Sequence, residues 1–221
     1  MGTTPSPRLE HFPISMSNPL NHPIVEESFA IIDREIGECA LSPSEYQILR
    51  RVIHTTADFE FEQLIRFSPN AIERAIATLP QAVPIITDVT MVRQGIVTMV
   101  SKTFGNPIVC AIDLAPSALP GKTRTETGML KCCDRFPQGI YVIGNAPTAL
   151  LALCDRIAVS STQPTLVIGA PVGFVSVLES KQALAQTDVP QIRIEGRKGG
   201  STVAAAILNA LLVLAWNAGE S

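Results

Sequence analysis

The sequence has no excess of positive charge, because its 17 Lys and Arg residues face 20 Asp and Glu residues for a net charge of −3. Non-specific binding to nucleic acid depends on such an excess, so nucleic acid is excluded as a partner. Aromatic residues make up only 5% of the 221 residues, which argues against a platform for stacking bases. Charged residues are also scarce at 17%, against 46% hydrophobic residues. This balance indicates a broad buried core rather than a disordered chain.

Motifs for disulfides, metals and common cofactors are also missing. The chain has five cysteines, an odd number, and no C-x-x-C motif, which disfavours a disulfide framework or a zinc site. We expect the cysteines to be small buried hydrophobic residues of a reducing cytosol, with Cys132 and Cys133 filling one helix. Neither G-x-G-x-x-G nor G-x-x-x-x-G-K-[ST] occurs, so no dinucleotide or P-loop site is evident. Without G-x-S-x-G, no Ser/His/Asp hydrolase site is indicated either.

The sequence also lacks an evident targeting or membrane segment. Residues 1–21 are rich in Pro, Ser and Thr and lack the apolar stretch of a signal peptide, so we interpret them as a loose extension. The longest apolar run, Val203 to Trp216, is interrupted by Asn209 and is too short to cross a bilayer, which predicts a buried helix. We therefore expect one cytoplasmic domain over residues 22–221 that contacts no membrane.

The first third of the chain has the pattern of helices. Residues 24–39 carry apolar residues at helical spacing. Ser42-Pro43-Ser44-Glu45 is typical of a helix start, with Ser42 as N-cap, and predicts a helix that runs to His54. Ser68-Pro69 predicts another helix start, with the helix ending near Leu79.

The remaining sequence alternates between apolar runs and helical patterns. The runs are continuous, which favours strands buried on both faces, and they cover 83–89, 107–113, 139–143, 165–168 and 189–194. Helices are predicted at 123–135, 147–158, 174–186 and 201–216. This order predicts a single three-layer α/β/α domain with a mainly parallel sheet, preceded by the helical third. The segment 95–106 fits either a hairpin arm or a loop.

Ligands of parallel sheets bind beyond the carboxyl ends of the strands, where this sequence carries glycine, proline and cations. Glycine lets a backbone approach a ligand closely, and helix N-termini attract anions. We therefore expect an anion-binding site, with Gly199 and Gly200 presenting backbone N–H groups. Its candidate residues are Thr87, Asp88, Asn145, Gly173, Arg197, Lys198, Gly199, Gly200 and Ser201. Ordinary turn geometry explains the same residue types, and that alternative stays open.

Two further sites have a functional and a structural interpretation. In Lys122-Thr123-Arg124, Arg124 is placed to hold a carboxylate or phosphate through two hydrogen bonds, or the segment is a solvated helix start capped by Thr123. Of the three histidines, only His54 lies in the predicted folded body past the first helix start. It is either a catalytic group or a cation at a helix terminus.

Taken in order, the segments resemble the precorrin-8x methylmutase (precorrin isomerase) family of cobalamin biosynthesis. The similar segments are 24–32, 51–54, 67–69, 84–92, 122–124, 143–150, 169–175, 179–181 and 196–201. The resemblance implies an isomerase that moves a methyl group from C11 to C12 of precorrin-8x, or of cobalt-precorrin-8. The products would be hydrogenobyrinic acid and cobyrinic acid, respectively.

The resemblance also implies the working parts of such an isomerase. It implies a homodimer without organic cofactor or protein-bound metal, in which His54 acts on a ring nitrogen as proton donor or acceptor. It places Ser28 and Arg124 against the corrinoid, and Arg51 in position to meet a carboxylate. The segment 125–128 departs from the small residues expected there, and Glu126 should point away from an anionic ligand.

Two other functions remain possible from the sequence. One is a corrinoid-binding or carrier protein without catalysis, which would not need a titratable group at His54. The other is an enzyme for a different anionic ligand such as a nucleotide, which the missing phosphate-loop motifs disfavour.

Overall fold

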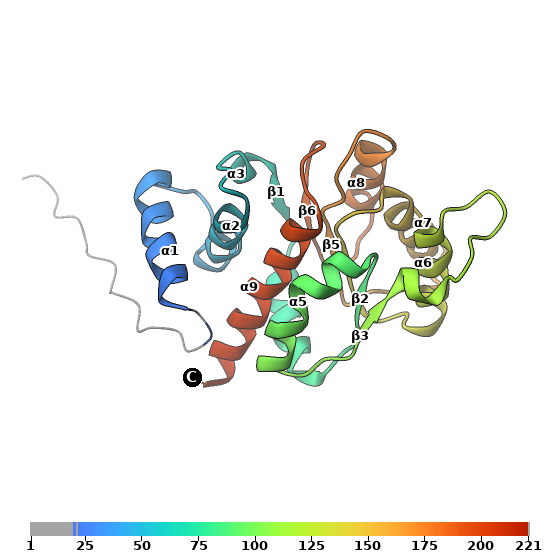
Figure 1. Ribbon diagram of the computed structural model, residues 1–221, viewed down its shortest axis with the longest axis horizontal. Coiled ribbons are helices and arrows are strands. Elements are labelled where there is room, and N and C mark those ends of the chain that lie inside the picture. Colours follow the sequence, from blue (N-terminus) through green and yellow to red (C-terminus); the bar gives the residue numbers. More distant parts are fainter. Residues whose placement is uncertain (1–19, 21, 221) are drawn as a thin grey trace, which may run out of the picture.

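A computed structural model describes residues 20 and 22–220 of the chain, so the predicted extension lies almost wholly outside the described residues. Within them, one six-stranded sheet runs in the order β1-β6-β5-β4-β2-β3 (Figure 1). Its strands are β1 Ile65–Phe67, β2 Ile85–Thr87, β3 Ile108–Cys110, β4 Ile140–Ile143, β5 Leu166–Gly169 and β6 Gln191–Ile194. Only β1 is antiparallel to its neighbour, so the prediction of a mainly parallel sheet is confirmed.

Helices cover both faces of this sheet. The helices are α1 Pro23–Ile36, α2 Pro43–Thr56, α3 Phe61–Leu64, α4 Ala71–Thr78, α5 Thr90–Lys102, α6 Arg124–Arg135, α7 Pro147–Ala158, α8 Val177–Ala185 and α9 Ser201–Glu220. Alternate residues of each strand enter opposite cores: Ile140 packs with α2, α4, α5 and α9, whereas Tyr141 packs with α6, α7 and α8. The three-layer α/β/α architecture follows from this division.

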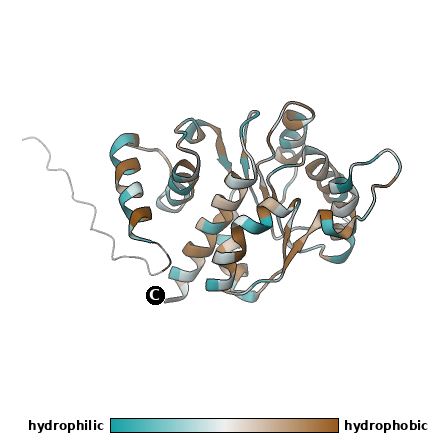
Figure 2. Ribbon diagram, in the orientation of Figure 1, coloured by the Kyte–Doolittle hydropathy of each residue, from teal (hydrophilic) through white to brown (hydrophobic). Residues whose placement is uncertain are grey.

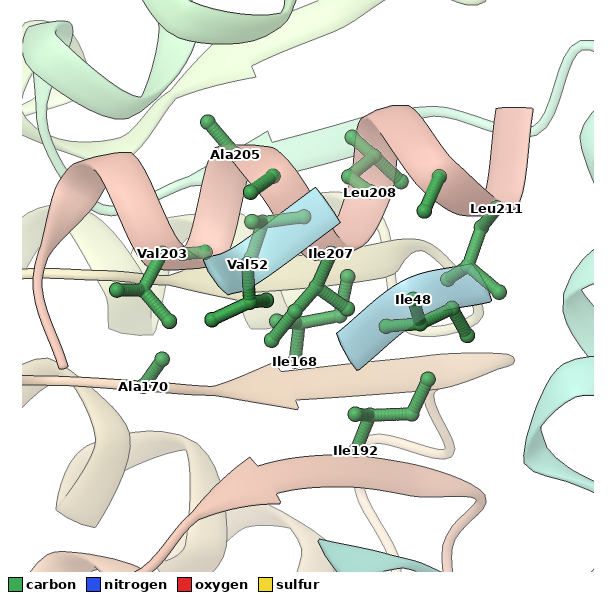
Figure 3. Close-up of a cluster of buried hydrophobic side chains, with 14 of the residues drawn as sticks. Ile48, Val52, Ile168, Ala170, Ile192, Val203, Ala205, Ile207, Leu208 and Leu211 are labelled. Carbon is green, nitrogen blue, oxygen red and sulfur yellow. The ribbon is translucent and has the colours of Figure 1, made fainter. Parts of the chain in front are cut away.

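The larger core forms where α2 and α9 meet the strands. Figure 3 shows Ile48 and Val52 of α2 beside Ile207 and Leu211 of α9, above Ile192 of β6 and neighbouring strand residues. These five side chains are fully or almost fully buried. At the edge, α1 carries both hydrophilic and hydrophobic residues (Figure 2), and it buries Phe29 and Ile32 where it packs on α2. The position of α2, which carries His54, is therefore fixed by the core of the domain.

Helix α9 confirms one expectation and corrects another. It is 20 residues long, longer than predicted. By length and composition alone it could cross a membrane, so the expectation that it is too short to do so is wrong. Most of its residues, including Val203 and Leu208, are nevertheless buried in this fold, where the helix packs on α2, α4 and α5. The interpretation as a buried helix is confirmed.

The segment that the sequence left undecided is the end of a helix and the loop after it. Helix α5 covers residues 90–102 and crosses α9 closely. A Cβ added at Gly95 would lie 2.8 Å from the Cβ of Ala205, so a glycine is required at the crossing. The predicted strand at 107–113 is shorter than expected, because β3 ends at Cys110 and a 3-10 turn follows.

Helix starts agree with the sequence where a capping residue was present. Ser42 caps α2, and Thr123 caps α6, each with the glutamate three residues later completing a capping box. The carboxylate of Glu126 is thereby used at the helix start, where it also pairs with Lys122. The predicted starts near Pro69 and Phe174 were too early, since α4 begins at Ala71 and α8 at Val177.

All five cysteines are free thiols, and Cys132 and Cys133 are buried in α6.

Candidate functional site

His54 lies in the last turn of α2 and is held by α1. Its Nδ1 is 2.7 Å from the Oγ of Ser28, a residue 26 positions earlier in the chain. The imidazole also meets the ring of Phe29 edge-on, at 5.5 Å between centroids. These two contacts fix the orientation of the ring and engage Nδ1, which leaves Nε2 as the nitrogen available to a ligand.

The surroundings of His54 favour its neutral form. Partial burial and the nearby guanidinium of Arg51 both lower the pKa of His54 from its ordinary 6.5. Burial, with the charge of Arg50 as a smaller cause, also lowers the pKa of Arg51. At neutral pH the free protein therefore holds an uncharged imidazole beside a cation.

We expect Arg51→Met to raise the pKa of His54, because it removes the positive charge that disfavours the imidazolium. NMR titration of the histidine ring protons would measure this shift directly. Arg34→Met, which removes a cation from the last turn of α1, serves as the control and should leave the titration of His54 unchanged. An unchanged pKa in Arg51→Met would leave burial as the sole cause.

The turn between β6 and α9 lies beside the segment that follows α2. The Nζ of Lys198 is 2.6 Å from Asp58 and 2.7 Å from Glu60. The hydrogen bond from Lys198 lowers the pKa of Asp58. Lys198 thus ties the turn to the segment that follows the His54 helix, and its role in holding a ligand stays a prediction. Arg197 is exposed, and its guanidinium lies 5.6 Å from the centroid of the Phe174 ring.

The glycines of this turn have a structural explanation. The N–H of Gly200 donates to the carbonyl of Ala170 at 2.8 Å, so the expectation that it faces a ligand is wrong. Gly199 has φ +149°, and an added Cβ would lie 2.4 Å from the same carbonyl oxygen. Gly173 has φ +135° and donates its N–H to the carbonyl of Arg197 at 3.3 Å. These glycines allow the β5–α8 and β6–α9 turns to pack directly against each other.

Asp88 stabilises the turn after β4. Its fully buried carboxylate accepts the backbone N–H groups of Gly144, Asn145 and Ala146 at 3.2, 2.8 and 2.7 Å. Burial raises the pKa of Asp88, although these hydrogen bonds oppose the shift. Because the side chain has no accessible surface, Asp88 positions the turn rather than contacting a ligand. Asn145 itself is exposed.

The remaining predicted residues lie at different depths along the same edge of the sheet. Thr87 is buried and its Oγ1 has no hydrogen-bond partner, and Ser201 is buried at the start of α9. Arg124 is exposed, and it donates from Nε to Ala115 O at 3.0 Å and from Nη2 to Ile112 O at 3.3 Å. Its helix, α6, covers the face of the sheet opposite α2, so His54 and Arg124 come from opposite faces.

The sequence reasoning missed the role of Lys181 in α8. This side chain is only 4% exposed, and its Nζ donates to Gly196 O at 2.8 Å and to Lys198 O at 2.7 Å. Burial lowers the pKa of Lys181 to about 8. Lys181 lies in the 179–181 segment of the family resemblance, but nothing in the local pattern distinguishes it from a surface lysine.

Two other features of the described residues lie outside this site. A cavity of about 920 Å³ opens at the amino ends of β4, β5 and β6, beside the last turns of α7 and α8, and none of the predicted site residues lines it. In the described part of the chain, no group of three or more His, Cys, Asp or Glu side chains is arranged to hold a metal ion.

Comparisons with known proteins agree with one another. The family profile described as precorrin-8X methylmutase matches residues 23–214. A cobalt-precorrin-8 methylmutase of Synechocystis sp. is 57% identical over 91% of this chain and 99% of its own length. A precorrin-8X methylmutase of Sinorhizobium sp. is 37% identical over 85% of this chain and 92% of its own length.

A solved structure is similar in fold as well. The crystal structure of precorrin-8x methyl mutase from Thermus thermophilus superposes with a TM-score of 0.83 at 41% identity, covering 89% of this chain and 97% of that one. The family, the sequence relatives and the fold all point to one kind of enzyme, and the chain belongs to the precorrin-8X methylmutase family of methyl-transferring isomerases.

Proposed function

We propose that this methylmutase moves a methyl group from C11 to C12 of precorrin-8x or cobalt-precorrin-8, with His54 acting on a ring nitrogen. The observation that carries the proposal is the 2.7 Å contact between Ser28 Oγ and His54 Nδ1. This contact orients the imidazole and leaves Nε2 to face the macrocycle. Under this proposal Ser28 positions the histidine, in addition to the contact with substrate that the family resemblance implies.

Protonation explains how one histidine could assist a carbon–carbon migration. A proton or strong hydrogen bond on a ring nitrogen withdraws electron density from the conjugated system while the methyl group moves between adjacent carbons. The proton then returns to Nε2, so the reaction is balanced without a redox partner. In the free protein, partial burial and then the charge of Arg51 lower the pKa of His54. Substrate carboxylates beside Arg51 would offset its charge and favour the imidazolium that donates the proton.

The substrate chemistry also fits the cations along the sheet edge. A corrin precursor is a large apolar plate with acetate and propionate groups at its rim. Arg51, Arg124 and Arg197 are the arginines we propose for these carboxylates. Arg124 uses only two of its five N–H donors on backbone carbonyls, so the others can pair with a carboxylate.

The test of the function is conversion of metal-free and cobalt-containing substrate by the purified protein, followed by absorbance. The methyl shift changes the conjugated system, so conversion changes the spectrum. We expect conversion of at least one of the two, and the comparison shows which is preferred. Binding of both without a spectral change would instead favour a corrinoid carrier.

We expect Arg124→Ala to weaken binding of the product by about 10- to 100-fold, the value of one hydrogen bond to a charged group. Arg135→Ala, in the last turn of the same helix, is the matched control and should bind normally. Titration of each variant with hydrogenobyrinic acid would measure both affinities. Equal affinity for Arg124→Ala and wild type would remove Arg124 from the proposed site.

We also propose a homodimer, as the family resemblance implies. Arg124 and His54 lie on opposite faces of one sheet, so a second copy could bring an arginine to the histidine of the first. Apolar surface suited to such contact is present in the β5–α8 segment, where Phe174 and Val175 are 86% and 82% exposed. Sedimentation equilibrium would show twice the chain mass, and a monomer at micromolar concentration would refute the dimer.

A further inference from the structure

A lysine buried in a protein is costly unless its ammonium group is hydrogen-bonded, so Lys181 needs an explanation. It is 4% exposed, and none of the ion pairs among the described residues gives it a carboxylate partner. Its contacts are instead the carbonyls of Gly196 and Lys198, at 2.8 and 2.7 Å. The lowered pKa, which burial alone accounts for, agrees with a cation lacking an acidic partner.

The two carbonyls flank Arg197, whose own carbonyl accepts the N–H of Gly173 at 3.3 Å. All three carbonyls of residues 196–198 are therefore engaged by protein donors. A free carbonyl oxygen would present the negative end of its dipole to an anion and repel it. By holding these oxygens, the protein removes that repulsion at a turn proposed to meet carboxylates.

Fixing the backbone on both sides of Arg197 also restricts where its side chain can go. The guanidinium is exposed and lies over the ring of Phe174 at 5.6 Å. The turn is also joined to the segment after the His54 helix, because the ammonium of Lys198 pairs with Asp58 and Glu60. The turn is thus anchored by Lys181 from α8 and by Lys198 to the α2–α3 segment.

We propose that Lys181 is a positioning residue for substrate binding, which holds the carbonyls of Gly196 and Lys198 so that Arg197 faces a carboxylate of the corrinoid. This role rests on the proposed function, because it assumes that Arg197 contacts the substrate. Lys181 itself touches neither the substrate nor the reacting atoms in this proposal.

The test compares Lys181→Met with Gln191→Met. Met keeps the length of the lysine but removes its donors. Gln191 is the matched control, because it is equally buried and its Nε2 donates to the carbonyls of Leu184 and Thr187 at the far end of α8. For Lys181→Met we expect KM to rise about tenfold, with kcat within about twofold of wild type. A tenfold rise corresponds to the loss of one charge-assisted hydrogen bond, here the one between Arg197 and the substrate carboxylate. Gln191→Met should lose stability while keeping the wild-type KM.

A double variant keeps the test decisive. If Lys181 acts through Arg197, then Lys181→Met combined with Arg197→Ala should have the same KM as Arg197→Ala alone. Should Lys181→Met fail to fold, Lys181→Gln, which keeps an uncharged amide donor group, replaces it in the same comparison with Arg197→Ala. An unchanged KM, or effects of the two substitutions that simply add, would overturn the proposal. Failure of the wild-type protein to convert substrate would instead count against the proposed function itself.

Discussion

We expect His54→Ala to lose about 10²–10⁴-fold in turnover, the usual contribution of a general acid or base. The substitution removes the nitrogen that exchanges a proton with the macrocycle, and no other histidine of the described residues lies in this site. Binding of the product should change far less, because the apolar contacts and the arginines remain. Single-turnover absorbance would give the rate, and titration with hydrogenobyrinic acid would give the affinity.

Thr55→Ala is a matched control for this variant. Thr55 is exposed in the same helical turn, and its hydroxyl donates to the carbonyl of Arg51 at 2.9 Å. We expect this variant to turn over at close to the wild-type rate. Ser28→Ala should lie between the two, because the imidazole stays but loses its partner at Nδ1. If His54→Ala kept a near wild-type rate between about pH 6 and 8, positioning and strain alone would have to explain catalysis.

The second large effect is on stability, at Asp88. Asp88→Ala leaves the backbone N–H groups of Gly144, Asn145 and Ala146 without their acceptor, so we expect the free energy of unfolding to fall by about 3 kcal/mol. Asp88→Asn should cost less than Asp88→Ala, because its amide oxygen can still accept a hydrogen bond. Some cost remains, since its NH₂ group then faces a backbone N–H donor. Urea denaturation, monitored by circular dichroism, would measure both changes.

The control for Asp88 is Asp134→Ala. Asp134 is exposed and pairs with Arg156 at 3.2 Å on the protein surface. Surface pairs contribute roughly 0–1 kcal/mol, so this variant should unfold almost as wild type. A loss below about 1 kcal/mol in Asp88→Ala would show that water or backbone movement satisfies the three amides.

The predictable parts of the fold were those with strong local signals. The apolar runs of β4 and β5 and the capping residues Ser42 and Thr123 identified their elements directly. Strand β1 was missed because it has three residues and exists through its pairing with β6. Helix α5 was not predicted, because Gly95 weakens the local helix pattern. The glycine is required by the close approach of α9, which lies more than a hundred positions later in the chain. Such long-range contacts leave no local pattern.

The site residues also divide into those that the sequence identified and those that depend on long-range contacts. His54, Arg51 and Arg124 stood out through family resemblance and residue chemistry. The inward direction of Asp88 and the pairing of Lys198 with two acids could not be inferred, because each depends on which segments the sheet brings together. Lys181 was missed for that reason too, since a lysine in an amphipathic helix normally lies at the surface.

The late position of β6 and α9 has a consequence for synthesis of the chain on the ribosome. Gln191 of β6 hydrogen-bonds Ser68 across 123 positions, and α9 supplies the centre of the larger core. Strand β1 and helix α2 are therefore made early and must wait, with their apolar faces open, until β6 and α9 emerge. The nascent protein is expected to depend on protection by chaperones over this interval, and to become resistant to protease only after α9 has left the exit tunnel.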